Sequence, residues 1–246
     1  MELNVLDGID VVILDIEGTT TPIDFVHETL FQFAKQNMHK FLSENKDSEI
    51  VKGALNGLLT MYMDIEGRAT WKDLGNADMD EVSIENATSI LNHLIQMDSK
   101  ASQLKLIQGM IWEEGYKDGR LRGEVYSDVP VSMKKWTSEG KEICIYSSGS
   151  VLAQKLIFST TVYGDLTRYI TNYFDTGIGR KTDPESYGKI AAAIKRNPER
   201  ILFISDSTVE LDAAASKGFR TLMIDRNENS RKNAYPRIVS SFSEIT

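Results

Sequence analysis

The sequence predicts an α/β fold, namely a Rossmann-like parallel sheet core with helices on both faces and an inserted all-helical cap domain. Two observations favour the core: short apolar, β-branched runs recur along the chain, and segments with helical periodicity lie between them. A third observation favours the insertion, because the stretch after the first run has helical spacing and no clear strand. A chain of 246 residues is long enough for a core with an added domain.

The first apolar run, residues 9–14, reads Ile-Asp-Val-Val-Ile-Leu and leads into the polar segment Asp-Ile-Glu-Gly-Thr-Thr-Thr-Pro. Its length and β-branching predict a buried parallel strand followed by a loop. Three later runs resemble it and are also predicted as strands: residues 142–146, 201–204 and 221–224.

Helices are predicted between these runs, over residues 151–158, 184–196 and 209–217, and Gly218 stands where the last of them would stop. Ligands of parallel α/β sheets bind beside the carboxyl ends of the strands. The polar residues that follow each apolar run are therefore the candidates for a functional site.

The predicted cap domain covers residues 24–125, and the predicted catalytic core comprises residues 1–23 and 126–246. Long insertions beside an active site commonly close over the substrate and exclude water. The cap has four candidate amphipathic helices, over residues 25–42, 50–62, 84–97 and 104–116.

Composition narrows the class of protein. Hydrophobic residues make up 41% and charged residues 26% of the chain, as in soluble globular proteins, and no apolar stretch approaches the roughly 18 residues of a membrane span. The net charge of −8 opposes binding to nucleic acid or anionic lipid. The single cysteine, Cys144, cannot form an intrachain disulfide. We expect a cytoplasmic protein, with the nucleus as a second location if the chain is eukaryotic.

Four groups of polar residues stand at the predicted strand ends or in adjacent loops. Each group is weak evidence alone, but their order on this topology points to a phosphoryl-transfer site for a small phosphorylated substrate. The groups are Asp15/Glu17/Thr19, Ser147/Ser148/Gly149, Lys181 and Asp206/Glu210/Asp212.

Asp15 is the candidate nucleophile, because a carboxylate at a strand end can attack phosphorus and form an aspartyl-phosphate. Magnesium would bridge the two anions, and Asp206 is the natural second ligand from a separate strand end. Lys181 would offset the negative charge, while the hydroxyl of Ser147 and the backbone N–H groups after it would hold phosphate oxygens.

Other roles remain open for several of these residues. Glu17 lies two residues beyond Asp15 and could act as general acid and base or complete the metal site. Ser147 and Ser148 could cap the following helix. Glu210 and Asp212 could belong to a solvated helix face.

The four groups resemble the motifs of the haloacid dehalogenase-like hydrolase superfamily, with Asp15, Ser147, Lys181 and Asp206 in the matching order. Most phosphatases of that superfamily have Asp two residues after the nucleophile, where this chain has Glu17. The segment Asp-Ile-Glu-Gly-Thr-Thr-Thr-Pro-Ile, with residues 104–116 and the later Tyr-Ser-Asp-Val, is similar to the enolase-phosphatase family of methionine salvage.

That resemblance implies a bifunctional enzyme, acireductone synthase, which enolises and dephosphorylates 2,3-diketo-5-methylthiopentyl-1-phosphate to 1,2-dihydroxy-3-keto-5-methylthiopentene. It also implies one Mg²⁺ per subunit and a monomer. The site residues that it implies are Asp15, Glu17 and Asp206 for the metal, and Ser147, Ser148 and Lys181 for the substrate. Asp15, Glu17 and Lys181 are the expected catalytic residues.

Three alternatives keep the same motifs. The first is a magnesium-dependent phosphatase of the superfamily that acts on another small phosphorylated metabolite. The second is a phosphate or metal sensor resembling a receiver domain, which the presence of Lys181 and a cap disfavours. The third is an inactive scaffold, which is disfavoured because no motif position is missing.

Overall fold

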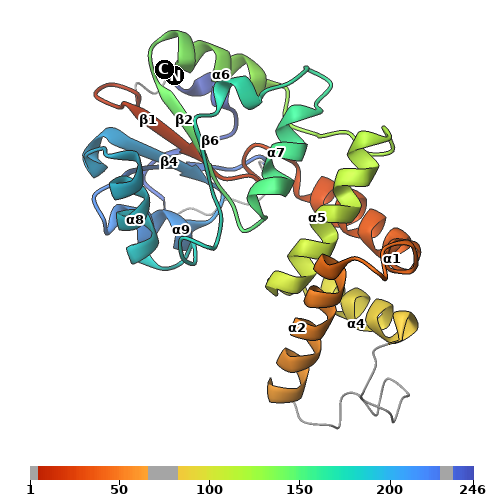
Figure 1. The fold of residues 1–246 in the computed structure, drawn as a ribbon. Helices are drawn as coiled ribbons and strands as arrows, with labels where there is room; N and C mark the ends of the chain where they lie inside the picture. The colour runs from red at the N-terminus through yellow and green to blue at the C-terminus, as the bar shows by residue number, and fades with distance from the viewer. Residues whose placement is uncertain (1–4, 66–82, 228–234) are drawn as a thin grey trace. The chain divides into compact units, whose positions relative to one another are not determined.

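The computed structural model describes residues 5–65, 83–227 and 235–246. Within them the chain forms a six-stranded, wholly parallel sheet in the order β3-β2-β1-β4-β5-β6 (Figure 1). The strands are β1 Val11–Leu14, β2 Glu142–Tyr146, β3 Asn172–Phe174, β4 Ile201–Ser205, β5 Arg220–Ile224 and β6 Ile238–Val239. The predicted parallel sheet is confirmed, and the first strand in sequence lies in its interior.

Alternate side chains of the central strands point to opposite faces of the sheet, and helices cover both faces. The helices around the sheet are α6 Asp128–Ser138, α7 Val151–Ser159, α8 Pro184–Ile194 and α9 Thr208–Ala215. Helices α8 and α9 lie on one face and α6 on the other (Figure 1). All four residues of β1 are buried, as expected for a central parallel strand with both faces covered.

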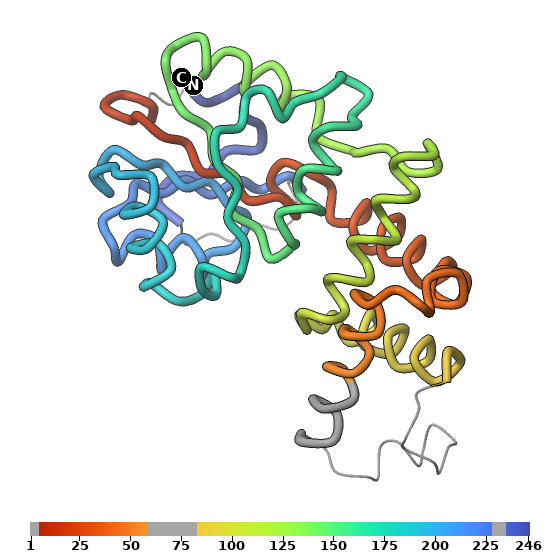
Figure 2. The backbone as a smooth tube through the Cα atoms, viewed as in Figure 1, coloured from red at the N-terminus to blue at the C-terminus, as the bar shows by residue number. Residues whose placement is uncertain are grey.

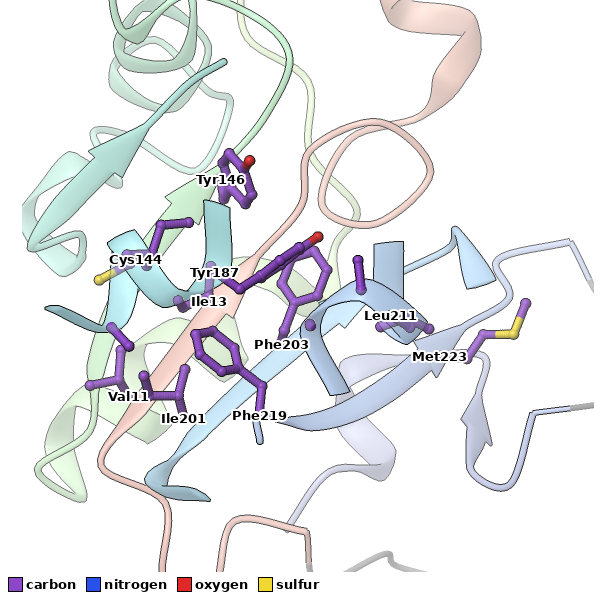
Figure 3. Packing of buried hydrophobic residues seen from close by; sticks show 14 residues of the cluster. Val11, Ile13, Cys144, Tyr146, Tyr187, Ile201, Phe203, Leu211, Phe219 and Met223 are labelled. Carbon is purple, nitrogen blue, oxygen red and sulfur yellow. The ribbon is translucent and has the colours of Figure 1, made fainter. Parts of the chain in front are cut away.

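Tyr187 of α8 is the centre of the core on one face. Its ring contacts the rings of Tyr146, Phe203 and Phe219 edge-on, with centroids 5.6, 5.4 and 5.6 Å away (Figure 3). Two of these rings come from β2 and β4 and the third from the residue before β5, so the aromatic cluster ties α8 to the strands whose ends carry the candidate site. Cys144 is buried in the same core.

The sequence-based strand and helix bounds differ from the structure in a few places. β3 and β6 are not predicted, because they are three and two residues long and lack a continuous apolar run. α6 is also absent from the predicted helices. α8 ends at Ile194 instead of Arg196, because Lys195 adopts the left-handed conformation (φ 55°). α9 ends at Ala215, and Gly218 (φ 85°) completes the turn that follows.

The structure divides into two compact units, one of Met1–Val26 with Arg122–Thr246 and one of His27–Leu121. The described part of the second unit is helical. Its main helices are α1 Gln32–Glu44, α2 Glu49–Ile65, α4 Ile84–Gln96 and α5 Ser102–Lys117, and a π-helical turn at Phe25–Phe31 leads into α1. Its assignment as a cap domain with the bounds 24–125 stays a prediction.

Tight packing stabilises this helical unit. The indole N–H of Trp112 donates to the carbonyl of Leu30 at 2.8 Å, and the Trp112 ring stacks on Phe31 with centroids 6.4 Å apart. None of the described helices is both long and apolar enough to cross a membrane.

Both described ends of the chain belong to the sheet-containing unit and lie side by side (Figure 2). The N–H of Leu6 donates to the carbonyl of Thr246 at 3.3 Å. The unit is therefore assembled from segments that are far apart in sequence.

Candidate active site

Three of the predicted site residues follow neighbouring strands of the sheet. β1 lies between β2 and β4, and the three strands run parallel. Asp15, Ser147 and Asp206 each come directly after the last residue of their strand. The sheet therefore brings these residues to one edge, as the order of the motifs predicts.

Lys181 lies between two carboxylates. Its Nζ is 2.6 Å from Oδ1 of Asp15 and 2.6 Å from Oε2 of Glu210, and its side chain is only 8% exposed. The rings of Tyr146 and Phe203 lie 5.8 and 5.9 Å from the ammonium nitrogen. Charges this deeply buried persist only when each has an opposite charge in contact, so the three groups depend on one another.

Two buried tyrosines fix the loop that carries Lys181. The hydroxyl of Tyr187 donates to the carbonyl of Lys181 at 2.8 Å, and the hydroxyl of Tyr146 donates to the carbonyl of Gly179 at 2.9 Å. Gly179 has φ 145°, and a Cβ there would lie 2.1 Å from Oγ of Ser186. The aromatic core thus positions the lysine through the backbone of its loop.

Ser205, the last residue of β4, joins the two carboxylates. Its Oγ lies 3.2 Å from Oδ2 of Asp15 and 3.0 Å from Oε2 of Glu210, and it accepts the N–H of Ser207 at 3.1 Å. Since a hydroxyl has one proton, it donates to one carboxylate at a time. The hydroxyl thus links the nucleophile candidate to the start of α9.

The electrostatics of this cluster follow from burial and contact. Burial works to lower the pKa of Lys181, but the carboxylates of Asp15 and Glu210 outweigh it, and the pKa is raised. Burial is also the main cause that raises the pKa of Glu210 to about 7. The charge of Asp15 adds to that effect, and Lys181 offsets it only in part. Lys181 therefore stays charged, while Glu210 titrates near neutral pH.

The turn after Asp15 is held by its own backbone. The N–H of Ile16 donates to Oδ1 of Asp15 at 2.7 Å, and the hydroxyl of Thr20 donates to the carbonyl of Asp15 at 3.0 Å. Gly18 has φ 69°, a left-handed conformation that lets the chain reverse sharply after Glu17. Glu17 is half-buried in the same turn, with its backbone bridged to Thr21.

Ser147 begins the loop between β2 and α7. Its N–H donates to the carbonyl of Phe174 at 3.2 Å, and its Oγ accepts the N–H of Gly149 at 3.2 Å. This bond uses an acceptor lone pair of the hydroxyl and not its proton, which can therefore be donated to a ligand. The N-cap of α7 is Ser150, so Ser147 and the half-buried Ser148 are not used as caps.

A guanidinium anchors the turn from the other side. Arg226 donates to the carbonyl of Thr19 through Nε at 3.0 Å and through a terminal nitrogen at 2.7 Å, and its third nitrogen lies 2.6 Å from Oδ2 of Asp128. A pocket of about 270 Å³ adjoins this region. It is lined by Gly18, Pro22, Ile23, Asp24, Tyr126, Asp206, Met223, Ile224, Asp225, Arg226 and Asn227.

The residues at this edge fit a magnesium ion of few protein ligands. A Cβ on Gly18 would lie 2.5 Å from Oδ2 of Asp206, so only glycine lets that carboxylate lie against the turn that carries Asp15 and Glu17. Among the described residues, no group of three or more His, Cys, Asp or Glu side chains forms a ready metal cage. Mg²⁺ usually binds one or two carboxylates, waters and substrate phosphate, which matches this arrangement.

Sequence reasoning missed part of the cluster. The sequence groups Glu210 with Asp206, but the alternative that Glu210 belongs to a solvated helix face is wrong, because its side chain is 16% exposed and contacts Lys181. Its position four residues after Asp206, across the start of α9, is the signal that places it beside the strand end. Ser205 and Arg226 gave no local signal, since a serine ends many strands and arginines are common on surfaces.

Residues 9–218 match the haloacid dehalogenase-like hydrolase family. The chain is 42% identical over 240 residues to a protein of Persephonella marina called enolase-phosphatase E1, an alignment that covers 97% of this chain and 99% of the relative. It is 40% identical over 220 residues to the Drosophila melanogaster protein of the same name, with 89% and 84% covered.

Solved structures agree with the fold. The Unknown transcript 4 protein of Saccharomyces cerevisiae is 30% identical and superposes with a TM-score of 0.74. The alignment covers 95% of this chain and 98% of the yeast protein. CbbY of Rhodobacter sphaeroides, solved with phosphate, has a TM-score of 0.56 at 13% identity, with 96% of each chain covered, and supports the fold alone.

Proposed function

The chain belongs to the haloacid dehalogenase-like hydrolases and, among them, to the enolase-phosphatases. From this premise we propose which residues bind the substrate and the metal and which carry out catalysis. It is an enzyme with phosphatase and enolase activities that acts in methionine salvage. The substrate we propose is 2,3-diketo-5-methylthiopentyl-1-phosphate, and the products are acireductone and phosphate.

The buried contact between Lys181 and Asp15 is the observation that carries the mechanism. A carboxylate attacks phosphorus poorly when the phosphate dianion repels it, and the ammonium 2.6 Å away reduces that repulsion. Asp15 forms the new O–P bond as the bond from phosphorus to the substrate oxygen breaks. Water then attacks the phosphorus of the aspartyl-phosphate, which releases phosphate and restores Asp15.

Ser147 and Ser148 hold the phosphate in this proposal. The Ser147 hydroxyl accepts the Gly149 N–H and donates its proton to a phosphate oxygen, and the backbone N–H of Ser148 adds a second donor next to the start of α7. Positioning and charge stabilisation supply most of the catalysis in phosphoryl transfer.

Asp15, Glu17 and Asp206 would hold one Mg²⁺ per subunit. That ion supplies charge neutralisation between the carboxylate and the phosphate. The support is the close approach of Asp206 to Gly18, because Gly18 lies in the same turn as Asp15 and Glu17.

Enolisation requires a base that removes a proton from the phosphate-bearing carbon. The carboxylate of Glu17 is our candidate, because it lies in the turn of the nucleophile and, once protonated, it can return a proton to the leaving oxygen. This role is compatible with the metal site when Glu17 contacts the ion through its backbone carbonyl or a metal-bound water. Asp15 must stay free for attack, and Lys181 stays protonated between two carboxylates.

We propose a monomeric enzyme in the cytoplasm, or also in the nucleus if the chain is eukaryotic. A single buried cysteine supports a reducing compartment. The net charge of −8 disfavours binding to nucleic acid.

The test uses purified protein, Mg²⁺ and the diketone phosphate, with phosphate release and acireductone absorbance followed together. Both products should appear. Asp15→Asn should abolish them, whereas Asp212→Asn, an exposed carboxylate on α9, should retain full activity. Phosphate release without acireductone would refute the enolase half, and turnover of a different phosphate ester alone would favour the alternative phosphatase. Activity of Asp15→Asn near that of the wild type would refute the nucleophile.

A further inference from the structure

Gln154 on α7 is a fully buried polar side chain, 0% exposed, that the mechanism above does not use. Its Nε2 donates to the carbonyl of Gly149 at 2.9 Å and to the carbonyl of Phe174, also at 2.9 Å. Both amide protons are thus given to backbone oxygens. Because both partners are acceptors, the amide has only one orientation that satisfies them.

One of the two carbonyls lies on β3, beside the first residue of the loop that begins at Ser147, and the other belongs to the loop itself. The carbonyl of Phe174 also accepts the N–H of Ser147, so Gln154 shares an acceptor with the first residue of the loop. The carbonyl of Gly149 belongs to the last residue of the Ser147–Gly149 segment. One side chain therefore fixes where this segment leaves β2 and where it enters α7.

A second feature points the same way. Oε1 of Gln154 is buried and has no hydrogen-bond partner in the described part of the chain. A buried side chain that served stability alone would be better apolar, since an unpaired buried acceptor is unfavourable. The two donors of Gln154 supply what an apolar side chain cannot, namely a fixed geometry of the segment.

We propose that Gln154 is a positioning residue for phosphate binding, which holds the Ser147 hydroxyl and the Ser148 N–H at the spacing that phosphate oxygens require. This inference rests on the proposed function, because it takes Ser147 and Ser148 as the phosphate-binding groups. It predicts that loss of the two donors weakens phosphate binding more than it weakens the fold.

The test compares Gln154→Met, which keeps the length of the side chain and removes both donors, with Thr161→Val. Thr161 is also buried and donates to the carbonyl of Gly164 at 2.6 Å, after the end of α7, so it is a matched loss of a buried side-chain hydrogen bond. The affinity of inorganic phosphate is measured by calorimetry, KM and kcat with the phosphate ester, and Tm for each variant.

Gln154→Met should weaken phosphate binding and raise KM by about 10-fold, with kcat reduced less than threefold, because two hydrogen bonds that order the loop are lost. Thr161→Val should lower Tm with phosphate affinity and KM unchanged. If Gln154→Met lowers Tm alone, the residue is merely structural and the proposal is wrong.

Gln154→Asn, which keeps the amide on a shorter side chain, is the second variant. It should give an intermediate phosphate affinity. If neither Gln154 variant accumulates as folded protein, the side chain is required for the fold and the proposal is overturned. A wild-type protein that binds phosphate but turns over no ester would contradict the proposed function, while the effect of Gln154 on phosphate affinity would still be measured.

Discussion

Gly18 shows how one residue without a side chain can connect the turn of the nucleophile to a second carboxylate. Its φ of 69° disfavours any other residue, and a Cβ would lie 2.5 Å from Oδ2 of Asp206. Gly140 has φ 81°, but a Cβ there would meet no described residue other than its chain neighbours within 4 Å, so it shares the backbone strain without the steric conflict.

Gly18→Ala and Gly140→Ala should each lower the free energy of unfolding by about 1–2 kcal/mol from the left-handed backbone alone. Gly18→Ala should in addition reduce kcat at least 100-fold, because Asp206 must move. Urea unfolding and steady-state kinetics on both variants check this. Equal activity of the two variants would show that the approach of Asp206 to Gly18 is not needed for catalysis.

Glu210 makes the stability of the protein depend on pH. Its pKa in the folded protein is about 7, above the usual value of 4.5, so the folded state holds its proton more tightly than the unfolded state. The stabilisation is complete below about pH 4.5 and is lost as the pH rises towards 7. Between those limits the free energy of unfolding of the wild type should fall by about 3 kcal/mol because of Glu210.

Glu210→Gln carries no titrating group at this position, so its stability relative to the wild type should increase from pH 5 to pH 8. Urea unfolding in EDTA at several pH values measures the difference between the two proteins. A difference that stays constant with pH would contradict the raised pKa of Glu210. Asp212→Asn, at an exposed position on the same helix, is the control and should show no such trend.

At the scale of elements, Arg226 joins three segments that are distant in sequence. Its guanidinium contacts Thr19 in the turn after β1 and Asp128 at the start of α6. It lies 4.2 Å from the ring centroid of Tyr126 and 4.8 Å from that of Phe242, near the C-terminus. A planar group with several donors is required to make all these contacts at once.

Arg226→Lys should therefore lower the free energy of unfolding by about 2 kcal/mol, since a lysine keeps the charge and loses the bidentate contact and the stacking. Loss of the bonds to the Thr19 carbonyl should also make the turn after Asp15 less rigid, and kcat should fall about 10-fold. Arg200→Lys alters an exposed ion pair with Asp10 and should change neither quantity noticeably. Full activity of a destabilised Arg226→Lys would show that the anchor serves the fold only.

Buried central strands can be predicted from the sequence, whereas short edge strands cannot. β1, β2, β4 and β5 are predicted because buried parallel strands need uninterrupted apolar runs. β3 and β6 are short strands at the sheet edges, where tertiary contacts decide the pairing.

The same distinction holds for the site. Asp15, Ser147 and Asp206 are predictable because each follows a strand that the apolar pattern reveals. Contacts of Lys181 with Glu210, or of Gln154 with Phe174, depend on how helices pack on the sheet. The spacing from Asp206 places Glu210 near a strand end, but no local pattern in the sequence specifies its contact with Lys181.

At the scale of the whole molecule, the two units differ in how far apart their contacting segments lie. The helical unit is one continuous segment, and in its described part α1 contacts α4 and α5, and α2 contacts α5, across shorter stretches of chain than those between β1 and its two neighbouring strands. In the other unit, Val11 must pair with Glu142 on one side and Ile201 on the other before β1 is in place. Closing such long loops costs conformational entropy before any contact forms, so this unit should fold more slowly.

Two tryptophans can report on the units separately. Trp112 is buried in the helical unit, and Trp136 is fully buried against Phe242 in the sheet unit, while Trp71 lies outside the described residues. We expect the fluorescence of a variant that keeps only Trp112 to reach its native value at least 10-fold faster in stopped-flow refolding than that of a variant that keeps only Trp136. Equilibrium unfolding of both variants is the control, since each must retain a native state. A single shared rate constant would mean that the helical unit acquires its packing only when the sheet forms, because long-range strand pairing would then limit both signals.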